Sequence, residues 1–482
     1  MNNLQFQLPD LSPAMPEIIL AVLAMIILLA DLVIKRKETL AFLSIIGIFV
    51  SAFYALTGTS GVAFGNMFIS DSYSAFFKLI FFFAAFLTIL ISVRHIAIEK
   101  INFGEYYALI LFSTLGMMIM VSTKNLMALY LGLELMSLSI YILSGFIRSD
   151  SRSNEAALKY FILGAFSSAF LLYGISIIYG LTGTTDLRAI AVYINENSLA
   201  ENKMLLLSVI FFVVAFGFKI AIAPFHMWTP DVYEGAPTAI TAFMSVGPKA
   251  AGFAIIGRVF YEAFGTLTLY VYWGNMLIPL ALVTIVIGNV IALSQTNIKR
   301  MLAYSSIAHS GYALLGIIAG TPDGLMSTMN YLMIYAFMNI GAFSIVIMLR
   351  RDGFSGVNID DYQGLAKKHP ITAAAMLVFM FSLTGIPPTA GFIGKFYVFM
   401  EAVNAGYVEI VVIAVIFSAV SAYFYLRIVM YMYMREPKED IMFKASPSIS
   451  LALIIAAAGT LFFGIMPSAL INLVKRSVES IF

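Results

Sequence analysis

Long apolar stretches recur along the whole chain, and they constrain its fold more than any other feature of the sequence. A transmembrane helix needs about 20 mainly apolar residues. Stretches of this kind lie at residues 16–34, 40–57, 73–93, 106–122, 125–147, 155–181, 203–222, 236–262, 274–294, 301–319, 324–349, 371–386, 391–434 and 447–466. The stretch 391–434 contains a short piece, which we expect to complete the span that begins at Ile371, and a full span from about Gly406. The sequence therefore predicts an all-α, polytopic membrane protein of about fourteen transmembrane helices, with an extra short helix near residues 225–234.

The composition also indicates a protein that faces lipid. Of the 482 residues, 61% are hydrophobic and only 11% are charged, whereas soluble domains carry roughly 25% charged residues. The net charge of +2 gives no reason to expect nucleic acid as a partner. Cysteine is absent, which removes disulfides and thiolate-bound iron–sulfur clusters. The longest polar stretch, Arg350 to His369, is typical of a surface loop, so we expect one membrane domain without a nucleotide or flavin module.

Lys and Arg are distributed unequally between alternate loops, which predicts the orientation because cytoplasmic loops are enriched in them. If the N-terminus lies outside, the outer segments carry five of these residues and the inner loops carry sixteen, namely Lys35, Arg36, Lys37, Arg94, Lys100, Arg148, Arg152, Lys299, Arg300, Arg350, Arg351, Lys367, Lys368, Arg435, Lys438 and Lys444. This bias predicts that both termini lie on the outer (periplasmic) side of the cell inner membrane. His95 and His369 fall in polar loops of this layout, and we assign them no role.

The remaining seven Lys and Arg side chains lie within the predicted spans: Lys78, Lys159, Lys219, Lys249, Arg258, Lys395 and Arg427. A cation at the bilayer centre costs about 2.5–3.5 kcal/mol on insertion scales, so each of them needs a reason. Lys78, Arg258 and Arg427 lie nearer the ends of their spans, where a long side chain can reach the interface or form a structural pair. Lys159 lies a few residues into its span and fits either a structural or a functional interpretation.

Three of these lysines lie beside prolines that we expect to break their helices. The pairs are Lys219 with Pro224, Lys249 with Pro248, and Lys395 with Pro387 and Pro388. Proline removes a backbone donor and frees a carbonyl, and at membrane depth such groups must be satisfied by protein or water. Water in the same interior can solvate an ammonium group, and broken helices with ionisable residues at mid-depth are typical of ion paths. The alternative is that the three lysines only cap freed carbonyls.

One carboxylate and two histidines extend this predicted polar axis. Glu134 is the one acidic residue squarely within a span, where it must be paired or protonated. His309 shares a helix face with Ser305 and Ser306, and this stripe of hydroxyls and imidazole can hold water. His226 follows the first expected break. Each of these residues is alternatively a hydrogen-bonded packing residue.

Buried lysine suits proton transfer. Its ordinary pKa is about 10.4, and burial lowers the pKa by up to several units, so that the proton can exchange near neutral pH. A nearby carboxylate raises the pKa again. Pairing Glu134 with a lysine would therefore make a switch between holding and releasing a proton, although the sequence shows neither the pair nor its distance.

Four segments around these residues resemble a known family. The segments are GLELMSLSIYIL, FKIAIAPFHMWTPDVYEGAPTAITAFMSVGPKAAGFA, QTNIKRMLAYSSIAHSGYALLGI and SLTGIPPTAGFIGKFYVF. They are similar to the subunit N family of bacterial respiratory complex I, the NADH:quinone oxidoreductase, and the resemblance covers essentially the whole chain. It implies an antiporter-like membrane domain with helices 1–3 (1–105), two inverted five-helix repeats (helices 4–8 in 106–262 and helices 9–13 in 274–434), each with one broken helix, and helix 14 with the C-terminus (447–482).

The resemblance also implies roles for individual residues. Glu134 looks like the helix-5 glutamate that modulates a lysine partner, and Lys219 looks like the helix-7 lysine of the input half-channel. Lys249 looks like the connecting helix-8 lysine, and Lys395 like the helix-12 residue of the output half-channel. The related subunit M usually has Glu at this last position. Lys159, Lys299, His226 and His309 match further family positions, so the resemblance adds them to these four residues on the expected proton path.

The implied function is proton translocation within a redox-driven pump. The chain would be an enzyme subunit through its complex, with no cofactor or metal of its own, while NADH, FMN, iron–sulfur clusters and quinone belong to partner subunits. The expected partners are the peripheral-arm subunits, other antiporter-like membrane subunits and the lipid bilayer. One alternative is a cation/proton antiporter subunit that works without redox partners, and another is a structural scaffold. The quinone and the electron donor stay open, because related complexes use other reductants.

Overall fold

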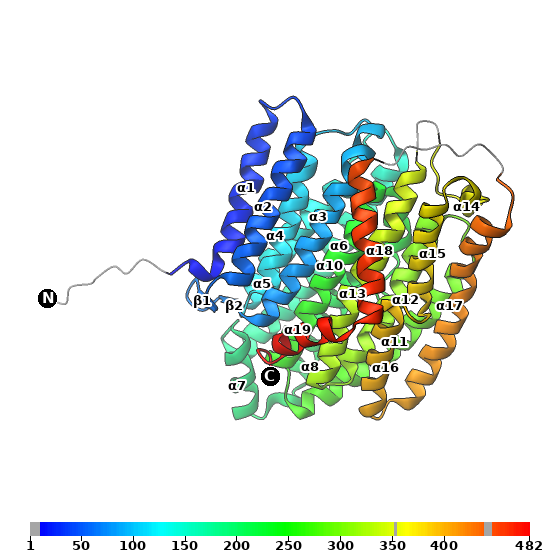
Figure 1. Cartoon of the computed structure of the whole chain (residues 1–482). Helices are drawn as coiled ribbons and strands as arrows, with labels where there is room; N and C mark the ends of the chain where they lie inside the picture. Colours follow the sequence, from blue (N-terminus) through cyan, green and yellow to red (C-terminus); the bar gives the residue numbers. More distant parts are fainter. Residues whose placement is uncertain (1–9, 351–353, 438–445) are drawn as a thin grey trace.

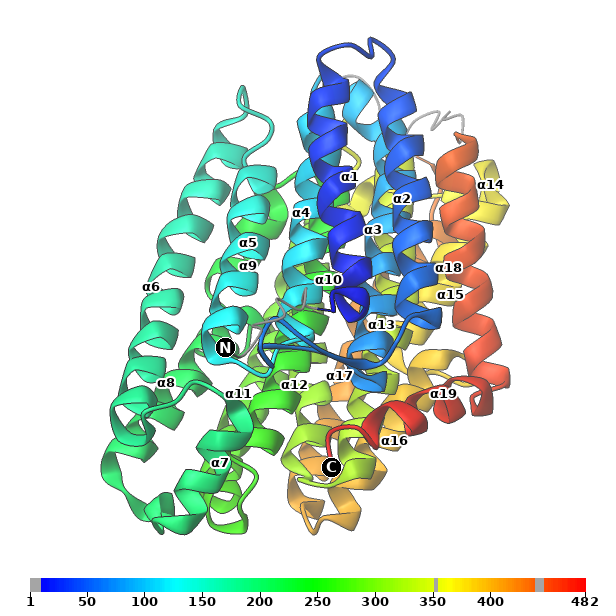
Figure 2. The same cartoon turned by 90° about the vertical axis from the view of Figure 1, so that its left-hand side faces the viewer.

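The computed structural model describes residues 10–350, 354–437 and 446–482, and helices make up most of the regular structure in these ranges. Figures 1 and 2 show a bundle in which most long helices stand side by side. The helices are α1 (Met15–Asp31), α2 (Lys37–Thr57), α3 (Ser72–Ile98), α4 (Gly104–Val121), α5 (Leu126–Ser144), α6 (Ser151–Thr182), α7 (Leu187–Glu196), α8 (Lys203–Lys219), α9 (Trp228–Gly235), α10 (Thr238–Arg258), α11 (Leu267–Ser294), α12 (Ile298–Ile318), α13 (Pro322–Leu349), α14 (Leu365–Lys368), α15 (Pro370–Thr384), α16 (Ala390–Asn404), α17 (Val408–Met434), α18 (Pro447–Ile465) and α19 (Ser468–Val478). A π-helical turn, η3 (Val259–Ala263), extends α10. A small antiparallel sheet of β1 (Gly61–Ala63) and β2 (Phe68–Ser70), which the sequence did not predict, joins α2 to α3.

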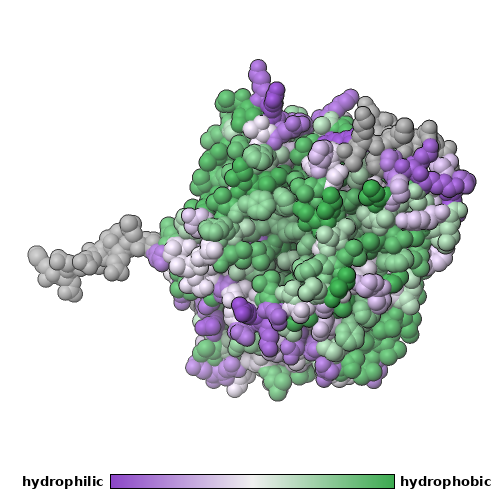
Figure 3. Space-filling model, viewed as in Figure 1, coloured by the Kyte–Doolittle hydropathy of each residue, from purple (hydrophilic) through white to green (hydrophobic). Residues whose placement is uncertain are grey.

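The described helices account for the predicted spans in two ways. Twelve helical segments are each long and apolar enough to cross a membrane, and they coincide with twelve of the fourteen predicted spans. Of the other two predicted spans, 203–222 corresponds to α8, and the short helix predicted near residues 225–234 is α9. The span that begins at Ile371 is divided between α15 and α16. Figure 3 shows mainly hydrophobic side chains over the flank of the bundle. The predicted fold class, an all-α polytopic membrane protein, is confirmed.

The first broken helix consists of α8 and α9. α8 ends at Lys219, and an irregular segment that contains Pro224 leads to α9. Carbonyls freed at such a break need donors from within the protein, because lipid offers none. The indole N–H of Trp228 supplies one donor, over 3.1 Å to the carbonyl of Phe218. The break is thus held by a contact across it.

The second broken helix consists of α15 and α16, with Pro387 and Pro388 between them. The backbone N–H of Gly391 donates to Ser382 Oγ over 3.0 Å. The ammonium group of Lys395 donates to two carbonyls at the end of α15. Polar side chains are therefore required at both breaks, and one of them is an ionisable lysine.

The break that we expected at Pro248 is absent, and this prediction is wrong. α10 continues through Pro248 from Thr238 to Arg258. Proline removes one hydrogen bond from a helix interior, but α10 is buried along its whole length by the surrounding helices. Close packing on all sides keeps the helix continuous where an isolated helix would kink.

The loops assigned to the same side of the membrane lie together. At one end of the bundle, Arg350 Nη2 donates to Glu99 Oε2 (2.8 Å), and Arg300 Nη1 donates to Glu234 Oε2 (2.7 Å). These contacts join loops that are predicted to lie inside. At the opposite end, Asn125 pairs through a β-bridge with Asp186, and Tyr270 contacts Tyr407. Of the basic residues assigned to the inner loops, Arg351, Lys438 and Lys444 lie outside the described residues.

The three cations that were predicted near span ends have structural partners. Lys78 Nζ lies 2.7 Å from Glu17 Oε1, and both side chains are buried. Arg427 donates from Nη1 to the carbonyl of Leu293 over 3.2 Å. Arg258 is buried between two carboxylates. These contacts satisfy the three cations, which explains how they are tolerated at membrane depth.

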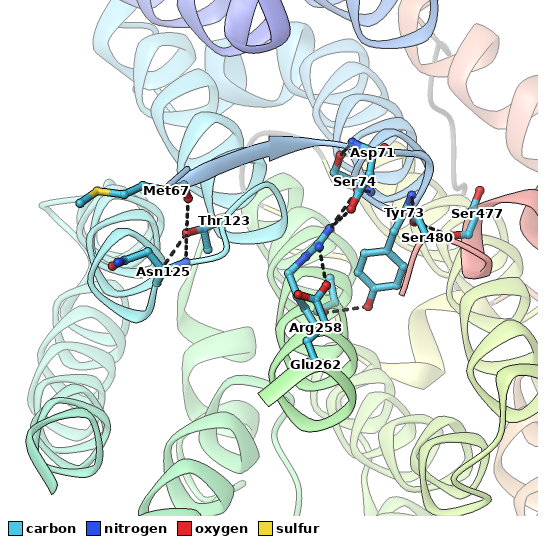
Figure 4. A network of polar contacts seen from close by, with 11 residues as sticks. Met67, Asp71, Tyr73, Ser74, Thr123, Asn125, Arg258, Glu262, Ser477 and Ser480 are labelled. Atoms are coloured by element: carbon cyan, nitrogen blue, oxygen red, sulfur yellow. Dashed lines mark hydrogen bonds and ion pairs between the residues drawn. The ribbon is translucent and has the colours of Figure 1, made fainter. Parts of the chain in front are cut away.

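The network around Arg258 is the most extensive of these (Figure 4). Its guanidinium group donates twice to Asp71, over 2.9 Å each, and once to Glu262, over 2.8 Å. The Tyr73 hydroxyl donates to the Ala254 carbonyl (2.8 Å), so that three hydrogen bonds or ion pairs join α10 to the beginning of α3 in this region. The backbone N–H of Tyr73 also donates to Ser480 Oγ, which connects the C-terminal segment to the same place.

His95 does not lie in a polar loop, so that assignment is wrong. α3 continues to Ile98, five residues beyond the predicted end of this span. His95 is therefore part of the helix and only 1% exposed, with Nδ1 3.9 Å from Glu99 Oε1. Hydropathy places the end of a span too early when polar residues in the last turn are covered by other helices.

Candidate functional site

Lys219 ends α8 with its ammonium group buried against α5. Nζ donates to Ser137 Oγ over 2.8 Å. The rings of Phe218 and Tyr141 have their centroids 5.6 and 6.0 Å from the same nitrogen, a distance at which aromatic faces attract cations. One hydroxyl and two rings therefore surround the charge.

Glu134 lies one helical turn before Ser137 on α5, but it forms no ion pair with Lys219 in this structure. Its Oε1 is buried and has no hydrogen-bond partner among the described residues. Leu131 and Leu138, which flank it on the same side of α5, are 65% and 50% exposed. Glu134 thus stands where the bundle interior meets the outward face of α5, close to the hydroxyl that Lys219 contacts.

Lys249 connects α10 to α12. Its Nζ donates to the carbonyl of Ser306 over 2.7 Å and to Ser310 Oγ over 3.0 Å. A Cβ at Gly252, one turn after Lys249 on α10, would lie 3.5 Å from Lys219 Cβ. α10 therefore contacts α8 at Lys219 and α12 at Ser306 and Ser310.

His309 continues the polar face of α12 and is held by two tyrosines from other helices. Nδ1 lies 2.5 Å from the Tyr331 hydroxyl on α13, and Nε2 lies 3.1 Å from the Tyr425 hydroxyl on α17. The Tyr425 hydroxyl also contacts Ser305, so the predicted hydroxyl-and-imidazole stripe includes one further hydroxyl from α17. Each ring nitrogen of His309 thus has a hydroxyl partner.

Lys395 lies on α16 at the second helix break. Its Nζ donates to the carbonyls of Leu383 (3.0 Å) and Thr384 (2.9 Å) and to Ser418 Oγ (2.9 Å), which accounts for its three protons. The ring of Tyr312, one turn after His309 on α12, lies 4.9 Å from the nitrogen. Lys395 and Ser418 also line a cavity of about 600 Å³ between α16 and α17.

The remaining predicted residues lie apart from this series. Lys159 forms ion pairs with Glu155 (2.6 Å) and Asp231 (2.7 Å) at the end of the bundle that carries the basic loops. Arg300 contacts the same Asp231 carboxylate (2.8 Å). His226 is buried in the irregular segment after α8, and its Nδ1 has no partner among the described residues.

Lys299 is a buried residue in the first turn of α12, and its assignment to a loop is wrong. Its Nζ donates to the carbonyls of Glu234 (2.8 Å) and Ala236 (2.7 Å). These carbonyls belong to the C-terminal end of α9, where a helix has acceptors without intrahelical partners. Lys299 therefore caps α9 and fixes the broken helix against α12.

Several residues of the site were missed by the sequence analysis. Two of them could have been found from the sequence, because Ser137 lies one turn after Glu134 and Ser310 directly follows His309. No sequence signal marks the residues that reach the site from distant helices: Tyr331, Tyr425 and Ser418. Among the described residues, no group of three or more His, Asp or Glu side chains is arranged to hold a metal ion.

Comparison with known proteins places the chain in a family. Residues 123–421 match the family described as "NADH:quinone oxidoreductase/Mrp antiporter, TM". The chain is 49% identical to NADH-quinone oxidoreductase subunit N of Trichlorobacter lovleyi, over 99% of this chain and 98% of the relative. The chain belongs to the subunit N family. The resemblance that was found in the sequence is thereby confirmed.

Two further comparisons agree with this assignment. The chain is 50% identical to NADH-quinone oxidoreductase subunit N 2 of Rhizobium meliloti, over 96% of this chain and 97% of that one. A chain of respiratory complex I from Thermus thermophilus, solved with bound aureothin, is 34% identical and superimposes with a TM-score of 0.81 over 95% of this chain and 98% of that one. The fold and the family assignment therefore extend over nearly the whole molecule.

Proposed function

We propose that this chain is the proton-translocating membrane subunit N of an NADH:quinone oxidoreductase. The observation that carries the proposal is the series of buried lysines on α8, α10 and α16, each with its ammonium group in contact with a neighbouring helix. Electrons pass through partner subunits, which hold the NADH, FMN, iron–sulfur clusters and quinone. This chain contributes directed proton transfer, coupled to those subunits through its contacts in the complex.

The proton path that we infer begins at Lys219 and passes Lys249 and His309 before it reaches Lys395. Each lysine donates to one serine hydroxyl from another helix, and the three serines are Ser137, Ser310 and Ser418. A carbonyl can only accept a hydrogen bond, whereas a hydroxyl both accepts and donates. The hydroxyls are thus the neighbours through which each ammonium group can pass a proton on.

Glu134 would act on the first lysine of this path. Its carboxylate is within one turn of Ser137, and its free Oε1 leaves it ready to take a cation or a proton. An approach of Glu134 to Lys219 would stabilise the charged lysine, and a withdrawal would favour release of the proton. We assign Lys159, Lys299 and His226 to the surroundings of the path, where the first two hold α9 in place.

Two features of the layout accompany this function. We assign the end with the basic loops to the cytoplasmic side of the inner membrane and both termini to the periplasmic side, supported by the grouping of these loops. We also assign residues 106–262 and 274–434 to two repeats. In support, the fourth span of each is the broken one, α8 with α9 and α15 with α16.

Substitution of the serines tests the path. Ser310→Ala is expected to slow proton translocation about five- to tenfold, since one lost hydrogen bond corresponds to about 1 kcal/mol, while NADH oxidation in the uncoupled enzyme is unchanged. Ser137→Ala and Ser418→Ala should act alike. Proton uptake by proteoliposomes with the assembled complex measures this. Ser344→Ala is the control, because Ser344 is buried but donates only to its own helix. Equal rates in all four variants would refute the assignment.

The antiporter alternative and the redox pump differ in what drives proton movement. Proteoliposomes with the assembled complex are expected to move protons when NADH and quinone are added, and not when a sodium or potassium gradient is applied alone. Cation-driven proton exchange without the redox substrates, abolished by Lys219→Ala, would instead establish an antiporter.

A further inference from the structure

A groove with no role in the proton path opens on the flank of the bundle between α1, α4 and α5. Its volume is about 740 Å³, and it lies at the end that carries the basic loops. The apolar part of its lining consists of Leu28 from α1, Leu109 and Phe112 from α4, and Ile142 from α5. These side chains lie on helices that are long and apolar enough to span the membrane, so this part of the groove lies at the level of the acyl chains.

The rim of the groove is charged. Lys100, Arg148 and Glu105 line it, all three are exposed, and none has an ion-pair partner in the described part of the chain. A fourth charged lining residue, Glu99, is already neutralised by Arg350. The rim therefore offers two free cations and one free carboxylate directly beside an apolar groove.

The backbone conformation at Lys100 independently indicates that its side chain has a functional role. Lys100 has φ 57°, in the left-handed region, directly after the end of α3. The N–H of Ile101 donates to the Ile96 carbonyl across this position, which is the helix-ending geometry that strongly favours glycine. A lysine here keeps an unfavourable backbone conformation and brings its charge to the rim.

We propose that this groove binds a phosphatidylethanolamine molecule of the surrounding bilayer. Lys100 and Arg148 hold its phosphate, Glu105 accepts hydrogen bonds from its amine, and one acyl chain lies against Leu109 and Phe112. Basic pockets between transmembrane helices are suited to phosphate headgroups, and the apolar part of the lining matches a hydrocarbon chain. The aromatic rings of Phe103 and Phe146, with centroids 6.3 Å apart, also line the groove.

Lipid retention by the purified, assembled complex tests the proposal. After delipidation in detergent, the complex is titrated with phosphatidylethanolamine or phosphatidylcholine, and bound lipid is counted by native mass spectrometry. The double variant Lys100→Gly with Arg148→Gln is expected to weaken binding of phosphatidylethanolamine at this site at least tenfold. Leu109→Trp, which fills the groove but leaves the rim intact, should have a similar effect. Lys35→Gln, at an exposed position of the same end outside the groove, should have none.

The Lys100→Gly variant also separates lipid binding from folding. In lipid-free detergent its melting temperature should equal or exceed that of the unmodified complex, because glycine suits the left-handed backbone. Glu105→Gln should reduce the preference for phosphatidylethanolamine over phosphatidylcholine. The reason is that the amine of phosphatidylethanolamine can donate hydrogen bonds to Glu105, whereas the quaternary ammonium group of phosphatidylcholine has no N–H. The proposal is overturned if the double variant and Leu109→Trp retain lipid normally. It is also overturned if the groove holds a helix of a neighbouring subunit in the assembled complex.

Discussion

Replacement of Arg258 by methionine is expected to destabilise the protein by about 3–5 kcal/mol, because removal of one partner of a buried ion pair leaves an uncompensated charge. Arg258 is fully buried and holds Asp71 and Glu262 at once, so both carboxylates would lose their cation. The network joins α3, α10 and the C-terminal segment near Ser480. We therefore expect a large fall in the melting temperature of the purified complex and little of the subunit in membranes.

Two further variants decide whether charge is the cause. The triple variant Asp71→Asn, Arg258→Met and Glu262→Gln removes the charges together, and it should recover much of the lost stability. Arg188→Met, at an exposed position of the same predicted side, should leave stability unchanged. If the triple variant were as unstable as Arg258→Met, the loss would come from packing and not from unpaired carboxylates.

Replacement of Lys395 by arginine is expected to abolish proton transfer through this chain while the structure is preserved. A guanidinium group can still donate to the Leu383 and Thr384 carbonyls at the end of α15, and the adjacent cavity of about 600 Å³ gives it room. Arginine does not release its proton at any physiological pH, whereas lysine can. The number of protons translocated per NADH oxidised should therefore fall although the complex assembles.

This substitution separates a proton carrier from a structural cap. If Lys395 only satisfies freed carbonyls, arginine should replace it without loss of pumping, and Lys395→Met should fail to assemble. The matched control is Lys203→Arg, at an exposed lysine at the beginning of α8. A normal proton-to-electron ratio in the Lys395→Arg complex would contradict the role that we assign to this residue.

The spans could be predicted from the sequence because hydropathy records removal from water, whether a side chain is covered by lipid or by other helices. The predicted span 324–349, for example, coincides with α13. The ionisable residues inside the spans could also be identified from the sequence, because charged residues are rare within long apolar stretches. Whether Pro248 breaks its helix could not be predicted, because the outcome depends on the helices that pack around α10.

The contacts of the candidate site depend on tertiary structure that the sequence does not display. Tyr331 and Tyr425, which contact His309, are 22 and 116 residues away in the chain. Whether Glu134 pairs with Lys219 stayed open in the sequence, and the orientation of α5 places Glu134 one turn from Ser137 with a buried oxygen that has no partner among the described residues. Lys299 was assigned to a loop because it precedes the predicted span 301–319, and only the position of α9 makes it a buried cap.

The most direct test of the proton path is a density map of the assembled complex at a resolution that shows ordered water. The contacts described above join Lys249 to α12 and Lys395 to Ser418, but between Lys219 and Lys249 and between His309 and Lys395 water must complete the chain. We expect ordered water molecules in both intervals, within hydrogen-bond distance of the two side chains at their ends. Dry, close-packed apolar side chains in either interval would contradict the proposed path.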